Sequence, residues 1–263
     1  MPTVQNGPPE GGRRIASPPS MVQLATEALL RMLLNGELRP GDRVVENRLT
    51  HELGISRPPL REALRVLEQQ GLVVQVPRRG AYVTRLSLHD LYELYTLRGE
   101  LERIAVELGV PCKDPARLDR CRRALAVMQD FAERGDPSAM LEPAYEFHAS
   151  VIGISGHRRL EDAYRSVQLQ MMMCMAMNRL ARSQRETLIE DVGRHRALLD
   201  RIEEGDRDAV LAELAVHGDK TFLVGIEERL DGHTPDALAW LERVRSAEEQ
   251  AGPHNRPAGP TFG

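Results

Sequence analysis

Three histidines in the second half of the chain have residue types and spacing that could hold a metal ion. His148, His195 and His217 are separated by 47 and 22 residues, so they fall on three different predicted helices. Three imidazoles gathered inside a helical bundle can bind a divalent ion on one face and leave positions open for water or a carboxylate. A single helical histidine is more commonly hydrogen-bonded or partly exposed than a ligand. The spacing alone therefore leaves both interpretations open.

The stretch GISRPPLREALRVLEQQG has the residue types needed to bind duplex DNA. Ser56 is a predicted N-cap, and the two prolines that follow fall in the first turn of a helix, where missing N–H groups break no intrahelical bond. Ser56, Arg57 and Arg61 would then present a hydroxyl, backbone N–H groups and two guanidinium groups to phosphate or to guanine in the major groove. Arg65 and Arg48 are expected to contact phosphate or to support a neighbouring side chain.

Two short apolar runs, LVVQV and AYVTR, follow this helix and are joined by the tip PRRG. Such runs around a short glycine-containing tip predict a β-hairpin. Arg79 and Gly80 at the tip could enter the neighbouring minor groove or hold a phosphate. Each arginine by itself is consistent with a solvated surface. The order of cap, prolines, basic helix and basic hairpin instead favours DNA binding by a winged helix-turn-helix.

The rest of the chain is predicted to be helical, because strand-like alternation is absent and breakers such as GDPS, SGH and EGDRD separate the apolar-periodic segments. The predicted fold is therefore mainly α, with an N-terminal winged helix-turn-helix and a C-terminal all-α helical bundle. Thr234 is the predicted N-cap of a last helix. The predicted helices after the hairpin cover residues 88–108, 116–134, 138–154, 158–182, 186–204, 207–230 and 235–249.

Charge is distributed unevenly along the chain. The first 85 residues carry 12 Lys and Arg against 8 Asp and Glu, whereas the remainder carries 23 against 31. A basic first third joined to an acidic remainder indicates two domains with different partners. We expect a DNA-binding domain and a helical effector- and metal-binding domain, followed by an additional helix and framed by flexible tails. These segments are expected at 20–86, 87–232 and 233–250, with the tails at 1–19 and 251–263.

The sequence favours a cytoplasmic protein with no membrane partner. Its three cysteines are scattered and form no CxxC pair, which argues for a reducing compartment and against a thiolate zinc site. No apolar run approaches the roughly 20 residues of a membrane span. The first 20 residues lack the apolar region of a secretory signal.

The run LRPGDRVVENRLTHELGISRPPLREALRVLEQQGLVVQVPRRGAYV resembles the N-terminal domain of GntR-family bacterial transcription regulators. The segments LYELYTLRGELERIAVEL, FHASVIGISGH and HRALLDRIEEGDRDAVLAELAVH resemble the ligand-binding domain of the FadR subfamily, the FCD type. The resemblance extends from about Val22 to Leu230. It implies operator DNA as one partner and a small-molecule effector as another.

The resemblance also implies a metal site made by an Asp four residues before the first His and by two later His. His148, His195 and His217 match the histidines, but Ala144 stands at the Asp position. Glu142 and Glu146 are six and two residues before His148 and would point elsewhere. Three interpretations remain. In the first, zinc or a similar ion is held by the three His, and water or an effector oxygen completes its coordination. In the second, Asp191 supplies the missing oxygen, although its place near a helix start predicts exposure. In the third, the histidines bind an anionic effector directly, without a metal.

Arg98 stands where FCD regulators place an arginine in the first helix of this domain. It could receive an effector carboxylate bidentately, or pair with Glu102 one turn later. The run MMMCMAM, from Met171 to Met177, is expected mainly to fill the core, and some of its methionines could line an adaptable pocket. Cys174, within this run, is too isolated to be a predicted metal ligand.

The leading hypothesis is a metabolite-responsive transcription regulator that binds a pseudo-palindromic operator as a homodimer. The family resemblance implies a small organic or sugar acid as effector, and a repressor that the effector releases. One alternative is a metal-dependent hydrolase or lyase, but HELGI at His51 does not complete an HExxH motif and no other acid/base constellation stands out. The other alternative is a regulator that senses the metal ion directly.

Overall fold

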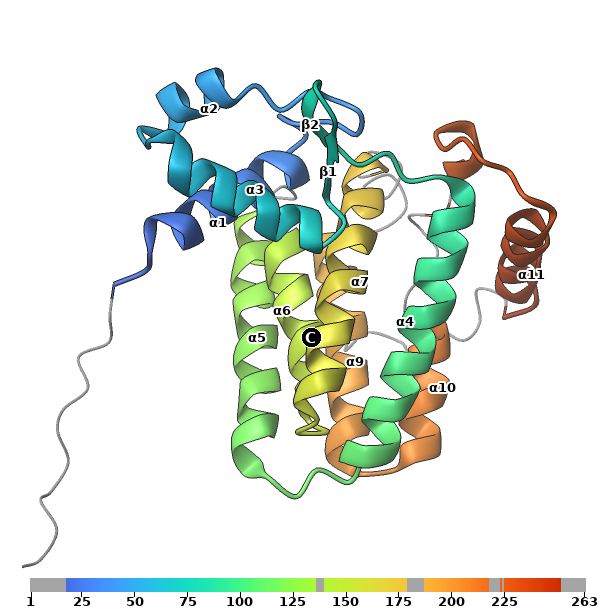
Figure 1. Ribbon diagram of the computed structural model, residues 1–263. Coiled ribbons are helices and arrows are strands. Elements are labelled where there is room, and N and C mark those ends of the chain that lie inside the picture. Colours follow the sequence, from blue (N-terminus) through green and yellow to red (C-terminus); the bar gives the residue numbers. More distant parts are fainter. Residues whose placement is uncertain (1–17, 136–139, 179–186, 218–222, 224, 252–263) are drawn as a thin grey trace, which may run out of the picture.

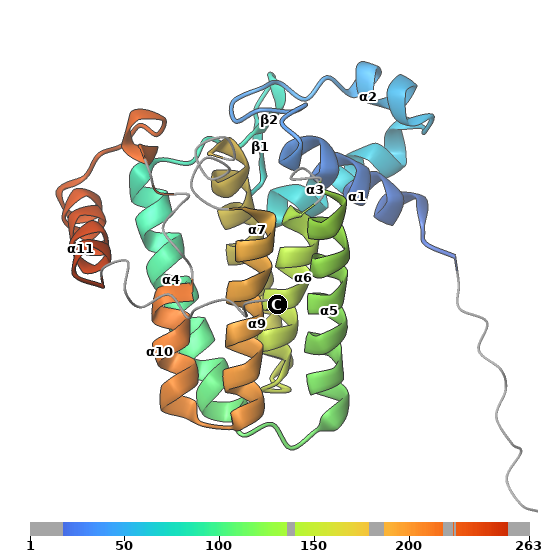
Figure 2. The same cartoon turned by 180° about the vertical axis from the view of Figure 1, so that it is seen from behind.

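The computed structural model describes residues 18–135, 140–178, 187–217, 223 and 225–251. A small N-terminal part, here called the head (residues 18–86), lies at one end of a helical bundle (residues 87–217), as Figure 1 shows. Figure 2, seen from behind, shows the same arrangement. Within the described residues no helix is long and apolar enough to cross a membrane.

The head is a winged helix-turn-helix, as predicted. Ser20 begins the first helix with a capping box, and Gly54 ends the second in the left-handed region at φ 63°. Ser56 precedes the third helix as predicted, but its side chain makes no capping hydrogen bond. The elements are α1 (Met21–Leu34), α2 (Glu46–Leu53), α3 (Arg57–Gln69), β1 (Val73–Val76) and β2 (Gly80–Val83).

The wing is a two-stranded antiparallel hairpin whose register runs from Val73 opposite Val83 to Val76 opposite Gly80. Arg78, at the tip, has φ 64°, a backbone conformation that residues other than glycine rarely adopt. The neighbouring Gly80 has φ 94°. The hairpin therefore turns within three residues, which keeps its basic tip short.

The bundle consists of long helices close to the predicted ranges. One prediction was wrong: the helix expected over 207–230 ends at His217, and residues 226–228 form a short 3-10 turn, η2 (Ile226–Glu228), after Gly225 at φ 62°. Parts of four predicted helices, residues 138–139, 179–182, 186, and 218–222 with 224, lie outside the described residues. The bundle helices are α4 (Leu88–Gly109), α5 (Pro115–Arg134), α6 (Leu141–Gly153), α7 (Arg158–Met177), α9 (Leu188–Glu204) and α10 (Arg207–His217).

Two hydrophobic clusters hold these parts together. One fills the bundle between α5, α6, α9 and α10, and it contains Leu125, Phe147 and Leu198, each at most 2% exposed. The other starts in the head with residues such as Leu64 and continues into α7 through Met171 to Cys174. The head and α7 therefore share apolar packing, and head and bundle are not independent units in this structure.

The predicted last helix is present as α11 (Pro235–Ala251), and it packs on α4. Trp240 is 4% exposed, and its ring centroid lies 5.2 Å from that of Tyr95 and 5.9 Å from that of Tyr92. At its start, the Thr234 hydroxyl accepts from the backbone N–H of Ala237, as an N-cap does. Figure 1 shows α11 beside α4, on the outside of the bundle.

The assigned core of the bundle predicts that two substitutions on α5 change the free energy of unfolding by very different amounts. Leu125→Ala, at a side chain 2% exposed, should lower the free energy of unfolding by about 2–5 kcal/mol, because it leaves a cavity in the cluster. Val127→Ala, at a side chain 47% exposed, should change it by about 0.5 kcal/mol or less. Urea unfolding followed by circular dichroism measures both, and equal effects would contradict the assigned core.

Candidate functional site

The three predicted histidines meet inside the bundle. His148 on α6, His195 on α9 and His217 on α10 are 8%, 3% and 2% exposed. One ring nitrogen of each lies within 4.8 Å of the others, and the ring centroids are 4.6 to 5.1 Å apart. Both ring nitrogens of His217 are buried without a hydrogen-bond partner among the described residues. Buried polar atoms without such a partner are rare unless they serve a ligand.

The ring of His195 is oriented by its own helix. Its Nδ1 lies 2.7 Å from the backbone oxygen of Asp191 and 3.4 Å from the Asp191 carboxylate. Asp191 is 6% exposed, so the expectation of an exposed position was wrong. Arg194 also donates to this carboxylate, at 2.8 Å. The backbone oxygen of Asp191 thus orients the His195 ring, and Asp191 is not part of the three-histidine cluster.

Burial and neighbouring charges favour the neutral form of two of these imidazoles, those of His148 and His217. Burial lowers the pKa of His148 well below its ordinary value, and the charge of Arg98 and the His195 ring lower it further. Burial and the two other rings likewise lower the pKa of His217. Neutral imidazole is the form that binds metal, because the ligating nitrogen must carry no proton.

The cluster fits a divalent ion. Nitrogens bound to one tetrahedral zinc ion are about 3.3 Å apart, because each Zn–N bond is about 2.0–2.1 Å long. The ring nitrogens lie within 4.8 Å of one another, so they would move closer together on binding one ion. Ala144, on the same helix as His148, packs against the bundle core and offers no oxygen. The described residues therefore offer three ligands, and the remaining positions are left for water or an effector.

Arg98 lies in the same interior and is 6% exposed. Its Nε donates to Glu102 Oε1 at 2.8 Å, and the hydroxyl of Tyr164 on α7 donates to the same oxygen at 2.8 Å. Burial acts to lower the pKa of Arg98, but the charge and hydrogen bond of Glu102 more than offset it, so the pKa is raised. The structure thus shows the helical pairing with Glu102 and also a charged group that acts on the histidine cluster.

The methionine run lies away from this cluster, in the hydrophobic cluster shared by the head and α7. Met171, Met172 and Met173 are at most 3% exposed. Cys174 is fully buried, and burial raises the pKa of its thiol to about 12. These side chains fill the core between the head and the bundle.

Arg57 and Arg61, on α3, the predicted recognition helix, are exposed, and their side chains contact residues of α2. Arg57 donates to the Asn47 side chain at 3.0 Å, and Arg61 pairs with Glu46 at 3.0 Å. Sequence reasoning missed both partners, because contacts over ten and fifteen residues leave no periodic signal. The outer arginines make local pairs: Arg65 with Glu62 at 2.7 Å and Arg48 with Glu52 at 3.5 Å.

The wing presents Arg79 and Gly80 to solvent, as predicted from the tip. Sequence reasoning missed Arg43, an exposed residue that forms a β-bridge with Tyr82 and whose guanidinium lies near Gly80. Exposed ion pairs contribute little free energy, so DNA phosphate can displace the carboxylate partners at low cost. The head therefore carries exposed arginines on both its recognition helix and its wing.

Two protein-family models match this chain. Residues 22–83 match the model described as bacterial regulatory proteins, gntR family, and residues 93–220 match the FCD domain. An HTH-type transcriptional regulator from an unstable DNA locus of Streptomyces ambofaciens is 30% identical over 222 residues, which cover 80% of this chain and 86% of that protein. The chain belongs to the GntR family. It is a transcription regulator with an FCD domain, and not an enzyme.

Two further comparisons agree with this family membership. A Paenarthrobacter nicotinovorans protein, named a probable D-xylose utilization operon transcriptional repressor, is 29% identical over 186 residues, covering 70% of this chain and 77% of that protein. The structure of Escherichia coli McbR/YncC superposes with a TM-score of 0.62 at 22% identity, covering 85% of this chain and 98% of that chain. The latter similarity shows a shared fold.

The exposed position of Arg61 on α3 predicts that removal of its guanidinium weakens DNA binding by the head. Arg61→Ala should weaken operator binding about 5- to 150-fold, the value of one bidentate base or phosphate contact of about 1–3 kcal/mol. Glu46→Gln, which removes the partner of Arg61 but leaves the guanidinium, should retain operator affinity. Fluorescence anisotropy with an operator duplex measures both, and unchanged binding by Arg61→Ala would refute its role on DNA.

Proposed function

We propose that this chain is a homodimeric repressor whose operator affinity is set by a small organic or sugar acid bound inside the helical bundle. The observation that carries this proposal is the buried cluster of three histidines, together with the buried, charged Arg98 that acts on two of their rings. Such a set of groups suits a carboxylate, because guanidinium pairs with it bidentately and a metal ion or imidazole binds its oxygens.

The residues that would hold one divalent ion per chain are His148, His195 and His217. When bound there, zinc or a similar ion would supply Lewis-acid positions for effector oxygens. Ala144 removes one protein oxygen that the family resemblance implies, so one further position is open to the effector. Arg98 would balance the effector's negative charge.

Repression is the direction that relatives support. The Paenarthrobacter nicotinovorans relative bears the name of a repressor, and so does a relative from Bacillus licheniformis. A dimer would place two heads on two half-sites related by a twofold axis, which matches operator symmetry to protein symmetry. We expect such a regulator to act in the cytoplasm, where its operator DNA lies.

The proposed metal site predicts the metal content of purified protein. After loading with zinc and removal of excess ion, the wild-type chain should retain about one zinc per chain, the number that one three-histidine site holds. His195→Ala should retain far less, because two histidines remain. His51→Ala, an exposed histidine on α2, is the matched control and should behave as wild type. Elemental analysis by mass spectrometry measures the ratio, and equal zinc in all three proteins would contradict the site.

The proposed effector class predicts a rise in melting temperature with the right acid. A ligand present at a hundredfold excess over its Kd stabilises the folded state by about 2.7 kcal/mol. A panel of metabolite carboxylates is tested by differential scanning fluorimetry, each with and without a chelator. Stabilisation lost in chelator means that an ion presents the acid, and stabilisation retained means that the histidines and Arg98 bind it directly. No stabilisation by any acid, with or without zinc, would argue against this effector class.

A further inference from the structure

Helix α7 contacts both the end of α3, the recognition helix, and the Arg98–Glu102 pair inside the bundle. Gln70 is the C-cap residue of α3, and its backbone oxygen accepts from the Gln170 side chain at 3.1 Å and from the Ser166 hydroxyl at 3.4 Å. The last carbonyls of a helix have no intrahelical partner. Two side chains of the bundle therefore cap the helix that reads DNA.

The contact at the end of α3 is close. Gly71 follows the cap with φ 75°, and a methyl group placed on it would stand 2.7 Å from the Gln170 side-chain nitrogen. That nitrogen also lies 3.5 Å from the backbone and hydroxyl oxygens of Ser166, one turn earlier on α7. Gln170 is thus held on its own helix while it reaches the head, so a displacement of α7 displaces the cap.

The same helix contacts Glu102, the partner of Arg98, six residues earlier. Tyr164, 1% exposed, donates to the Glu102 oxygen that Arg98 also uses. Six residues correspond to about 9 Å along a helix axis. An anion bound to Arg98 would compete with Glu102 for the guanidinium, and Glu102 is the carboxylate that accepts from Tyr164. One short rigid segment therefore links the proposed effector contact to the cap of α3.

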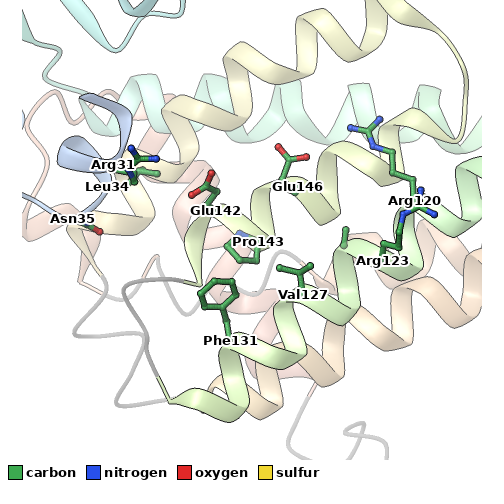
Figure 3. Close-up of a pocket in the computed structure, with 11 residues that line it drawn as sticks. Arg31, Leu34, Asn35, Arg120, Arg123, Val127, Phe131, Glu142, Pro143 and Glu146 are labelled. Atoms are coloured by element: carbon green, nitrogen blue, oxygen red, sulfur yellow. The ribbon is translucent and has the colours of Figure 1, made fainter. Parts of the chain in front are cut away.

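On another side the head has room to move. A groove of about 630 Å³ lies between the end of α1 and helices α5 and α6, lined on the head side by Arg31, Leu34 and Asn35. Figure 3 shows these residues across from Glu142 and Phe131 of the bundle. Among the described residues, no hydrogen bond or ion pair crosses this groove. A rotation of the head about its contact with α7 would change the width of this groove without breaking a polar contact there.

We propose that Gln170 and Ser166 are positioning residues for operator recognition, and that α7 transmits the state of the Arg98–Glu102–Tyr164 group to the recognition helix. The second part rests on the proposed function, because it assigns an effector to Arg98. The first part rests on the contacts of Gln70 and on DNA binding by this family. A two-state element that both sites bias is what allosteric coupling requires.

A double-mutant cycle on operator affinity tests the proposal without any effector or metal. Gln170→Leu removes the donor to Gln70 and should weaken operator binding about five- to tenfold, the value of one or two neutral hydrogen bonds. Tyr164→Phe removes the donor to Glu102 and should also change operator affinity. In the Gln170→Leu background, Tyr164→Phe should add almost nothing, because its effect reaches the DNA through the missing cap.

The measurement is anisotropy with an operator duplex that the wild-type chain has selected from a random pool. Gln129→Leu, on the exposed face of α5, is the matched control and should stay within about twofold of wild type. Melting followed by circular dichroism shows whether each variant folds. If Gln170→Leu unfolds the head, Gln170→Glu, which keeps the size of the side chain and also lacks the donor, takes its place.

Each outcome decides the proposal. Wild-type operator affinity in a folded Gln170 variant would overturn the positioning role. Single effects that multiply in the double variant would overturn the coupling through α7. A carboxylate that raises the melting temperature while the cycle is multiplicative would reject this coupling and leave the proposed effector site standing. A non-multiplicative cycle with no stabilising carboxylate would support the coupling and reject the effector class.

Discussion

The burial of Arg98 is the constraint on which the interior of the bundle depends. A guanidinium that is 6% exposed must be paired, because an isolated charge costs several kcal/mol to remove from water. Glu102 lies one turn later on α4, and the hydroxyl of Tyr164 on α7 donates to the same carboxylate oxygen as Arg98 does. The pair therefore joins two helices. The same positive charge helps to keep the pKa of His148 and His217 low.

The two functional regions follow opposite electrostatic rules because their ligands differ. DNA is a dense line of phosphates. The arginines expected to contact it form exposed ion pairs, such as Arg61 with Glu46, whose carboxylate a phosphate can replace at low cost in free energy. A small effector must be selected among many metabolites, and the proposed effector site offers buried groups whose desolvation is already complete. Helix α7 lies between these regions and contacts both.

Sequence patterns predicted the head almost residue by residue, since caps, prolines and turn glycines act over three or four positions. The same patterns predicted a helix that continues beyond the end of α10. Leu223, Ile226 and Leu230 keep helical spacing and are all buried, but Gly225 takes a left-handed conformation and the chain forms a 3-10 turn instead. Periodic burial arises wherever a chain returns to a core every three or four residues, so it cannot separate one long helix from a short turn.

Local sequence patterns were sufficient to predict the winged helix-turn-helix, the helical character of the remainder and the residue types available for chemistry, because each depends on neighbours in the chain. Tertiary structure alone decided that three histidines 22 and 47 residues apart meet within 4.8 Å. It also buried Asp191 behind His195 and placed Gln170 on the end of α3. These contacts depend on how whole helices pack, and packing is set by the shape of both surfaces together, which no local pattern contains.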